Sequence, residues 1–243
     1  MTGRVAGRRP LLSVDARGYG AADGRRQMAI QQGLIEVMTA AAAAAGLPRN
    51  DWDCQPAGDG ELAVLPAGVP ESALIDDFVR LLAGHLADHN EDRRDDARLR
   101  LRLAVHNGVV ERAANGWAGA GAVVVSRLAD AGPARAAQEA IPAAGLVVVL
   151  SNRVFLDTVA QGHTSLRAVR FRKVEVRHKE FRDDAWLYCP DGDVHALDLE
   201  DRPITPDHPP RTGEPVRQSA SVINNFHRKV TAEVIGIQEN RHG

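Results

Sequence analysis

The sequence predicts an α+β fold whose first 190 residues follow the element order βαββαβ, with further elements after it. Three observations predict this fold. A buried strand ends near residue 15, a long amphipathic helix follows it, and a strand pair then folds back around a Gly/Asp-rich turn near residue 59. A second helix and a further strand complete the unit, because helical and strand periodicities alternate once more.

The first strand is predicted over residues 10–16 (PLLSVDA), a short apolar run that leads into the glycine-containing turn RGYG. Asp15 is therefore expected at the end of a buried strand. From about residue 25 to 45, apolar residues recur mostly every three or four positions, and Gly46 follows. This pattern is typical of a long amphipathic helix that ends at a glycine.

Two short runs, residues 52–56 and 61–66, flank the tetrad AGDG at residues 57–60. A Gly/Asp-rich tetrad between two such runs is typical of a β-hairpin turn. Asp59 is expected at the tip of that hairpin.

A second helix is predicted between residues 70 and 90, where large apolar residues form a helical stripe. The next strand is predicted over residues 99–106, because leucine and valine alternate there with Arg98, Arg100 and Arg102. Period-two alternation predicts a strand with one solvent-exposed face, and the arginines are interpreted as that face.

The remaining apolar segments predict a helix near residues 123–131, a strand over 146–151, a short helix over 152–161 and a β pair around 169–176 and 185–188.

Residues 199–219 are too rich in proline for a packed element and predict an extended linker. The folded domain is therefore placed at residues 8–190. Residues 220–243 are too short to fold alone, and we expect them to form a C-terminal interaction segment.

The composition limits the possible functions. The 243 residues are 44% hydrophobic, which is ample for a packed core, and their formal net charge is −2. This near balance favours neither nucleic acid nor a membrane surface as a partner. No apolar run approaches the ~18 residues of a membrane span. Cys54 and Cys189 lack metal-type spacing and the N-terminus lacks a signal-peptide pattern, so a cytoplasmic protein is expected.

Asp15 and Asp59 are candidate metal ligands. A βαββ unit brings the end of its first strand beside the hairpin tip, so the two carboxylates are expected side by side on a rigid sheet. Hard anionic oxygen ligands of this kind suit a pair of divalent cations. The alternative is purely structural, since aspartate is common in turns.

Five segments resemble, in order and spacing, the catalytic domain of the class III nucleotide cyclases. They are SVDARGYG from Ser13, AGDGELAVLP from Ala57, LRLAVHNGVV from Leu101, GAGAVVVSRL from Gly119 and FRKVEVRHKEFRDDAWLY from Phe171. The resemblance covers about residues 8–190. It implies a ferredoxin-like sheet with helices on one face, and an enzyme that closes a nucleoside triphosphate into a cyclic monophosphate.

The resemblance implies roles for individual residues. Asp15 and Asp59, together with Ala16, match the metal-binding positions, which implies two Mg²⁺ or Mn²⁺ ions per site. One ion would activate the ribose 3′ hydroxyl and the other would hold the β- and γ-phosphates. Backbone N–H groups of the following turn would receive the triphosphate. The residues of this turn are Ala16, Gly18, Tyr19 and Gly20.

Two further positions complete the implied site. Arg127 matches the arginine that meets negative charge on the α-phosphate in the transition state. Lys179 falls near the position of a triphosphate-binding lysine. In the family these parts come from two subunits, so the resemblance implies a head-to-tail homodimer with two interfacial active sites and an inactive monomer.

The chain departs from the family at the positions that recognise the base and ribose. Gln55 stands where adenylate cyclases have a purine-binding lysine, and Gly116 stands where they have its partner aspartate. Val123 replaces the asparagine that orients the ribose. A glutamine amide both donates and accepts, so Gln55 can pair with uracil or cytosine as readily as with a purine.

The segments GDGELAVLP, LRLRLAVHNG and HKEFRDDAW are similar to those of the bacterial pyrimidine cyclases of antiphage (Pycsar) systems. This resemblance implies UTP or CTP as substrate, cyclic UMP or cyclic CMP as an alarm signal, and a separate effector that binds the product. Two alternatives stay open: a purine cyclase acting on ATP or GTP, and an inactive cyclase-derived regulatory module. Val123 favours the inactive module, and retention of Asp15, Asp59 and Arg127 opposes it.

Overall fold

One mixed β-sheet forms the centre of the computed structural model, which describes residues 6–178 and 180–199. Its strand order is β2-β3-β1-β4-β6-β8-β7, and β5 pairs with β4 beside this path. All neighbours are antiparallel except β4 and β6, which are parallel. The strands are β1 (Gly7–Ala16), β2 (Asp53–Ala57), β3 (Gly60–Val64), β4 (Leu101–Ala113), β5 (Gly116–Ala118), β6 (Leu146–Ser151), β7 (Arg172–His178) and β8 (Phe181–Tyr188).

The helices connect these strands in the predicted order. They are α1 (Gly24–Ala44), α2 (Glu71–Ala73), α3 (Val79–Asn90), α4 (Ala120–Ala129), α5 (Gly132–Ala140) and α6 (Asn152–Asp157), and a π-helical turn (Leu74–Phe78) joins α2 to α3. Short 3₁₀ turns occur at Arg49–Asp51, Asp95–Ala97 and Ala168–Arg170. None of the described helices is both long and apolar enough to cross a bilayer.

The predicted α+β fold with the core order βαββαβ is confirmed, and β7 and β8 are the predicted extra β elements. The predicted linker over residues 199–219, apart from Leu199, and the segment over 220–243 lie outside the described residues.

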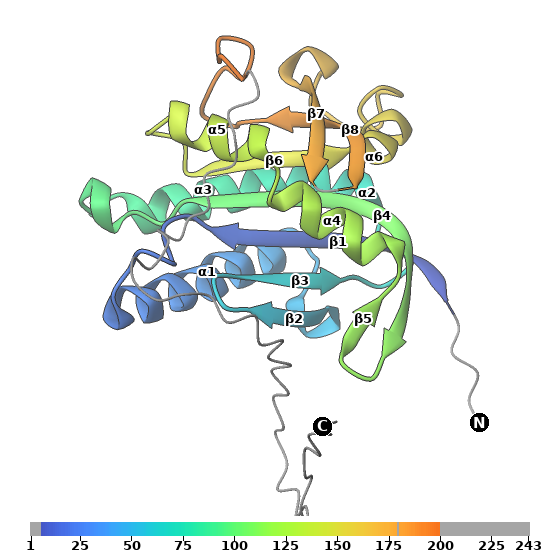
Figure 1. Cartoon of the computed structure of the whole chain (residues 1–243), viewed down its shortest axis with the longest axis horizontal. Coiled ribbons are helices and arrows are strands. Elements are labelled where there is room, and N and C mark those ends of the chain that lie inside the picture. Colours follow the sequence, from blue (N-terminus) through green and yellow to red (C-terminus); the bar gives the residue numbers. More distant parts are fainter. Residues whose placement is uncertain (1–5, 179, 200–243) are drawn as a thin grey trace, which may run out of the picture. The chain divides into compact units, whose positions relative to one another are not determined.

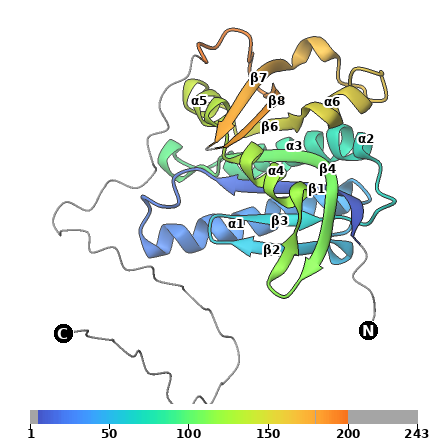
Figure 2. The same ribbon diagram turned by 45° about the vertical axis from the view of Figure 1, so that its right-hand side comes forward.

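Helices cover both faces of this sheet. Leu34 of α1 and Leu82 of α3 are buried with Leu103 of β4 on one face. Val125 of α4 and Ala134 of α5 are buried in a second core on the other face. The ribbon views show α4 lying over β1 and β4, with α3 behind the sheet (Figure 1, Figure 2). The expectation of helices on one face is therefore wrong, because the small side chains of α4 and α5 also pack against the sheet.

β4 lies between β1 and β6, and both of its faces are covered. Arg102 is only 4% exposed, so the interpretation of the arginines as a solvent-exposed strand face is wrong. A buried guanidinium is tolerated only with polar partners, and Asp15 and Gln138 both accept hydrogen bonds from Arg102. Arg100 is half-buried against the end of α5.

Two elements were not predicted. α5 has the sequence GPARAAQEA, whose buried side consists of Ala134, Ala137 and Gln138. Small and polar residues of this kind produce no stripe of large apolar side chains, so helical periodicity does not indicate the helix. β5 is a three-residue strand that pairs with the far end of β4.

The β2–β3 hairpin places Asp59 beside the end of β1. Gly58 and Asp59 form a two-residue turn between the paired residues Ala57 and Gly60, and Gly58 has a φ of +63°. Gly60 is required for a different reason. A Cβ added there would overlap the carbonyl oxygen of Val14 on β1. β3 can therefore approach β1 this closely only with glycine at position 60.

We predict that Gly60→Ala destabilises the protein by about 1–3 kcal/mol, because the added methyl group must push β3 away from β1. Urea unfolding of both proteins measures the difference. Gly68→Ala is the matched control, since a Cβ at Gly68 meets nothing within 4 Å. Equal stability of the two variants would show that the close approach of β3 to β1 is not a constraint.

Candidate active site

Asp15 and Asp59 meet at one end of the sheet. Asp15 pairs in register with Gly60 of β3, so the hairpin tip lies directly next to the end of β1. The N–H of Ala16 donates a hydrogen bond to the carbonyl oxygen of Asp59 at 2.9 Å, which ties the tip to the strand. The expected juxtaposition of these two residues is therefore present in the structure.

Arg102 forms an ion pair with Asp15 from the neighbouring strand, where the two residues are in register. Its Nη2 lies 2.6 Å from Oδ1 and 2.7 Å from Oδ2 of Asp15, but only the contact to Oδ2 has hydrogen-bond geometry. The buried Oδ1 is left without a hydrogen bond. Nη1 of Arg102 donates to Oε1 of Gln138 at 3.1 Å, so α5 also holds this guanidinium in place.

The electrostatics of Asp15 reflect this crowded position. Burial is the largest influence and raises the pKa of the Asp15 carboxyl above its ordinary value. Arg102 acts in the opposite direction, whereas the negative charges of Asp59 and Asp130 raise the pKa further.

The residues at this end of the sheet fit a divalent cation. Among the described residues, no group of three or more His, Cys, Asp and Glu is arranged to hold a metal. Mg²⁺ in nucleotide sites, however, binds through one or two carboxylates and the substrate phosphates. Oδ1 of Asp15 lies 2.6 Å from Nη2 of Arg102 but accepts no hydrogen bond from the described residues, so it keeps lone pairs for a cation. Arg102 offsets one of the two negative charges, so we expect phosphate oxygens to be needed for tight binding.

The β1–α1 loop offers backbone N–H groups next to these carboxylates. The N–H groups of Ala16 and Arg17 are already used, by Asp59 and by the carbonyl oxygen of Arg100 at 2.9 Å. Among the described residues, the N–H groups of Gly18, Tyr19 and Gly20 make no hydrogen bond. The amides that can receive a phosphate therefore begin at Gly18, and the Ala16 amide of the predicted loop is not among them.

Gln31 of α1 holds the loop against the hairpin. Its Nε2 donates to Oη of Tyr19 at 2.8 Å and to the carbonyl oxygen of Gly58 at 2.9 Å. Nε2 of Gln27, one turn earlier, donates to the carbonyl oxygen of Tyr19 at 3.2 Å. The side chain of Tyr19 thus fixes the loop relative to the two aspartates.

Arg127 lies on α4, and its described contacts are with residues of the β7–β8 hairpin. Its Nη1 donates to the carbonyl oxygen of His178 at 3.0 Å, and its guanidinium lies over the ring of Phe181. Val123 precedes Arg127 by one helical turn and is 51% exposed, so both side chains lie on one face of α4. Lys179 follows β7 in the chain and lies outside the described residues.

Gln55 and Gly116 adjoin each other, as a pair of base-binding positions would. A Cβ added to Gly116 would lie 2.7 Å from Cδ of Gln55, and Gly116 has a φ of +95°. Oε1 of Gln55 accepts a hydrogen bond from the N–H of Trp117 at 3.3 Å. Nε1 of Trp117 is buried without a hydrogen-bond partner in the described part of the chain.

Sequence reasoning missed Arg102, Gln31 and Gln138 at this site. The sequence places Arg102 in a strand that can pair with the strand of Asp15. An alternating pattern does not give the register between the two strands, so it does not show that Arg102 lies opposite Asp15. Gln31 and Gln138 lie within helices whose polar residues carry no local signal of a tertiary partner.

We predict that Mn²⁺ binding in the presence of a triphosphate weakens on acidification at a higher pH than an ordinary aspartate would cause. Asp15 must be ionised to bind the cation, and its raised pKa lets protons compete sooner as the pH falls. Electron paramagnetic resonance of free Mn²⁺ across a pH series measures the midpoint. Arg102→Gln should move the midpoint to still higher pH, because it removes the charge that lowers the Asp15 pKa. A midpoint unchanged by this substitution would contradict the assignment.

Comparison with solved structures shows the fold. The chain is similar to the guanylyl cyclase Cya2, with a TM-score of 0.53, 14% identity and coverage of 82% of this chain and 100% of that chain. It is also similar to an adenylate/guanylate cyclase/hydrolase from Silicibacter pomeroyi, with a TM-score of 0.56, 18% identity and coverage of 78% and 100%. A bacterial light-regulated adenylyl cyclase gives a TM-score of 0.52 at 9% identity, over 80% of this chain and 56% of that chain.

No protein-family model and no curated protein matches the sequence. The structural matches agree with the resemblance that the five sequence segments indicate, at the level of the fold. The described part of the chain therefore has the fold of adenylate and guanylate cyclase domains.

Proposed function

We propose that the chain is a metal-dependent nucleotide cyclase that converts UTP or CTP into its 3′,5′-cyclic monophosphate and pyrophosphate. The observation that carries the proposal is the meeting of Asp15 and Asp59 beside a loop with unbonded N–H groups. The same arrangement lies in a fold similar to a guanylyl cyclase and to adenylate/guanylate cyclases.

The residues of the chain would divide the chemistry as follows. Asp15 and Asp59 would hold Mg²⁺ or Mn²⁺, which supplies Lewis-acid activation of the 3′ hydroxyl and neutralises phosphate charge. The N–H groups of the loop from Gly18 to Gly20 would orient the triphosphate. Arg127 would stabilise the charge that builds on the α-phosphate as the 3′ oxygen attacks phosphorus and the bond to pyrophosphate breaks. Lys179 is proposed as a further triphosphate ligand.

A homodimer with interfacial sites is part of the proposal. Arg127 contacts His178 and Phe181, and none of its described contacts reaches the aspartates of the same chain. We therefore assign the metal ligands and the arginine of one site to different chains. Two chains arranged head to tail would bring Arg127 of one to Asp15 and Asp59 of the other.

The polarity of Gln55 supports a base that presents a carbonyl group, such as uracil, over cytosine and adenine. The N–H of Trp117 can only donate, so the amide group of Gln55 must turn its oxygen toward that N–H. Its NH₂ group is then the part left for a base. A donor matches the O4 carbonyl of uracil, and equally the O6 carbonyl of guanine, and opposes the N4 amine of cytosine and the N6 amine of adenine. The choice of uracil over guanine follows from the resemblance to pyrimidine cyclases.

Gly116 also argues against adenine, because no carboxylate at this position accepts from its exocyclic amine. The rival proposal is a purine cyclase, since the similar solved structures are named adenylyl and guanylyl cyclases. A site that hydrogen-bonds one base discriminates strongly against a base that leaves its polar groups unpaired.

The proposed biological role is an alarm signal in antiphage defence, sensed by a separate effector that binds the cyclic nucleotide. This part follows from the similarity of the hairpin and of the β4 and β8 segments to pyrimidine cyclases. The second candidate function is an inactive regulatory module. The exposed Val123, on the same face of α4 as Arg127, favours it.

We predict that purified protein with Mn²⁺ turns over UTP or CTP faster than ATP or GTP, and that Asp59→Ala abolishes this turnover because the metal loses one of two protein carboxylates. Chromatography of products from all four triphosphates measures both. Turnover of only ATP or GTP would reject the pyrimidine proposal, and near-normal turnover by the variant would reject the metal assignment.

We predict that a mixture of Asp59→Ala and Arg127→Ala chains, each inactive alone, recovers about a quarter of the wild-type rate, because a mixed dimer keeps one complete site. Refolded or co-expressed mixtures provide the sample, and the rate is measured with the preferred nucleotide. A mixture of Asp59→Ala with Asp15→Ala is the control and stays inactive, since both lesions fall in the same half-site. Recovery in the control, or none in the test mixture, contradicts an interfacial site.

We predict that Gln55→Glu raises the ratio of CTP to UTP turnover about tenfold or more, because it replaces the NH₂ donor with an acceptor at the same position. The carboxylate can still accept from the N–H of Trp117. Gln161→Glu, at an exposed position, is the matched control for the added charge. A ratio that does not change would place Gln55 outside the base site.

A further inference from the structure

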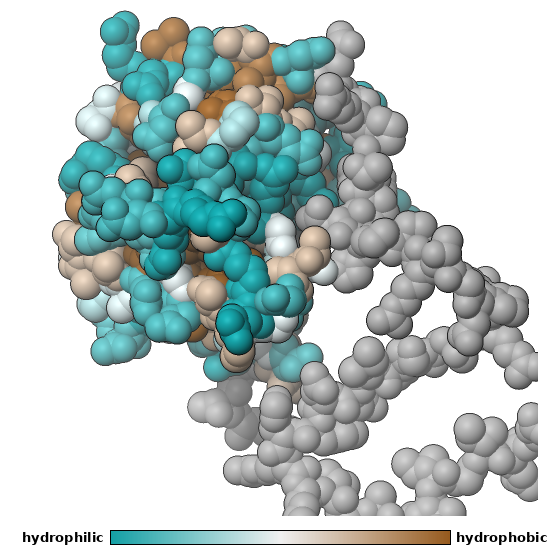
Figure 3. Space-filling model, turned by 90° about the vertical axis from the view of Figure 1, so that its left-hand side faces the viewer, coloured by the Kyte–Doolittle hydropathy of each residue, from teal (hydrophilic) through white to brown (hydrophobic). Residues whose placement is uncertain are grey.

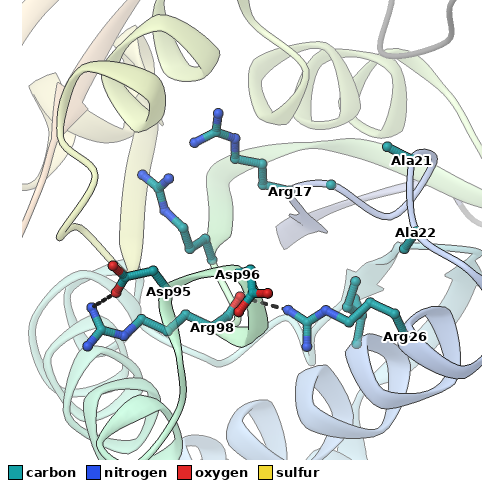
Figure 4. A pocket seen from close by; sticks show the side chains of 10 residues that line it. Arg17, Ala21, Ala22, Arg26, Asp95, Asp96 and Arg98 are labelled. Carbon is teal, nitrogen blue, oxygen red and sulfur yellow. Dashed lines mark hydrogen bonds and ion pairs between the residues drawn. The ribbon is translucent and has the colours of Figure 1, made fainter.

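A pocket of about 300 Å³ adjoins the β1–α1 loop on the side of α1 and the segment before β4. Its charged lining consists of Arg17, Arg26, Arg98, Arg100, Asp95 and Asp96. Figure 4 shows Arg17, Arg26 and Arg98 on three separate segments around one hollow. Figure 3 faces this end of the sheet, and hydrophilic side chains dominate its centre.

The two carboxylates in the lining already have arginine neighbours. Oδ1 of Asp95 lies 3.0 Å from Nη1 of Arg98, and Oδ1 of Asp96 lies 3.5 Å from Nε of Arg94. The remaining guanidinium groups, those of Arg17, Arg26 and Arg100, form no ion pair with any described residue. The pocket therefore carries positive charge that the described part of the chain does not balance.

Arg100 is held rigidly by backbone carbonyls at the end of α5. Its Nε donates to the carbonyl oxygen of Ala144 at 3.1 Å, and its Nη2 donates to those of Ile141 at 2.8 Å and Gln138. Its Nη1 makes no hydrogen bond within the described residues. A fixed guanidinium with unused N–H groups is preorganised for an oxyanion.

Arg26 is fixed in a similar way, because its Nη2 donates to the carbonyl oxygen of Arg98 at 2.9 Å. Arg17 is exposed, and its side chain has no hydrogen-bond partner among the described residues. Burial, and then the like charge of Arg17, lower the pKa of Arg100 to about 10. The arginines of the pocket outnumber its carboxylates, so their like charges repel each other, and a bound anion would reduce that cost.

We propose that this pocket is a binding site for a phosphate-type anion, separate from the two aspartates and from the cations they would hold. Its ligands are the guanidinium groups of Arg17, Arg26 and Arg100. Two sources share this chemistry, free inorganic phosphate and pyrophosphate, and pyrophosphate would be the second product of the proposed reaction. Anion binding itself does not depend on the proposed function.

The test is calorimetric titration of the full chain with pyrophosphate and with inorganic phosphate, in EDTA and at constant ionic strength. Arg17→Gln and Arg26→Gln should each weaken binding about tenfold, the effect of losing one charged hydrogen bond. Arg80→Gln, at an exposed position outside the pocket, should bind as wild type does. Circular dichroism checks that each variant is folded.

Tighter binding of pyrophosphate than of phosphate identifies the reaction product as the ligand, and equal binding identifies free phosphate. No binding at millimolar concentration, or equal binding by wild type, Arg17→Gln and Arg26→Gln, overturns the proposal. If the chain binds the anion but cyclises no nucleotide, the proposed function is rejected and the anion site stands.

Discussion

The antiparallel pairing of β1 with β3 on one side and β4 on the other is the constraint on which the candidate active site depends. This register sets Asp15 opposite Gly60 and Arg102, and it brings Asp59 to the end of the same strand. A slip of one residue would turn Asp15 to the other face of the sheet. Glycine at position 60 permits the close approach, so a local backbone requirement determines where both carboxylates lie.

Burial of a charged pair then shapes the chemistry of the site. Burial of the Arg102 guanidinium would cost free energy of folding without an oppositely charged partner. Asp15 is that partner. The pair leaves one buried carboxylate oxygen of Asp15 without a hydrogen bond to the described residues. Gln138 holds the other end of the guanidinium, which links the packing of α5 to the position of a candidate metal ligand.

The elements around Asp15 and Asp59 could be predicted because apolar periodicity and a Gly/Asp turn are local signals. The burial of Arg102 could not be predicted. Arginine alternates with leucine in the same way whether helices cover one face of the strand or both faces. α5 was not predicted, because its buried alanines pack without forming a stripe of large apolar side chains. The polarity of Gln55 depends on the N–H of Trp117, a contact between residues far apart in the chain.

The most direct measurement of the central claim is Mn²⁺ binding, by electron paramagnetic resonance, in the presence of a triphosphate that lacks a 3′ hydroxyl. If the two carboxylates share the cations under the triphosphate, Asp15→Asn and Asp59→Asn each weaken binding, and the double variant loses little more than either one. Binding that neither substitution changes would show that these aspartates hold no metal.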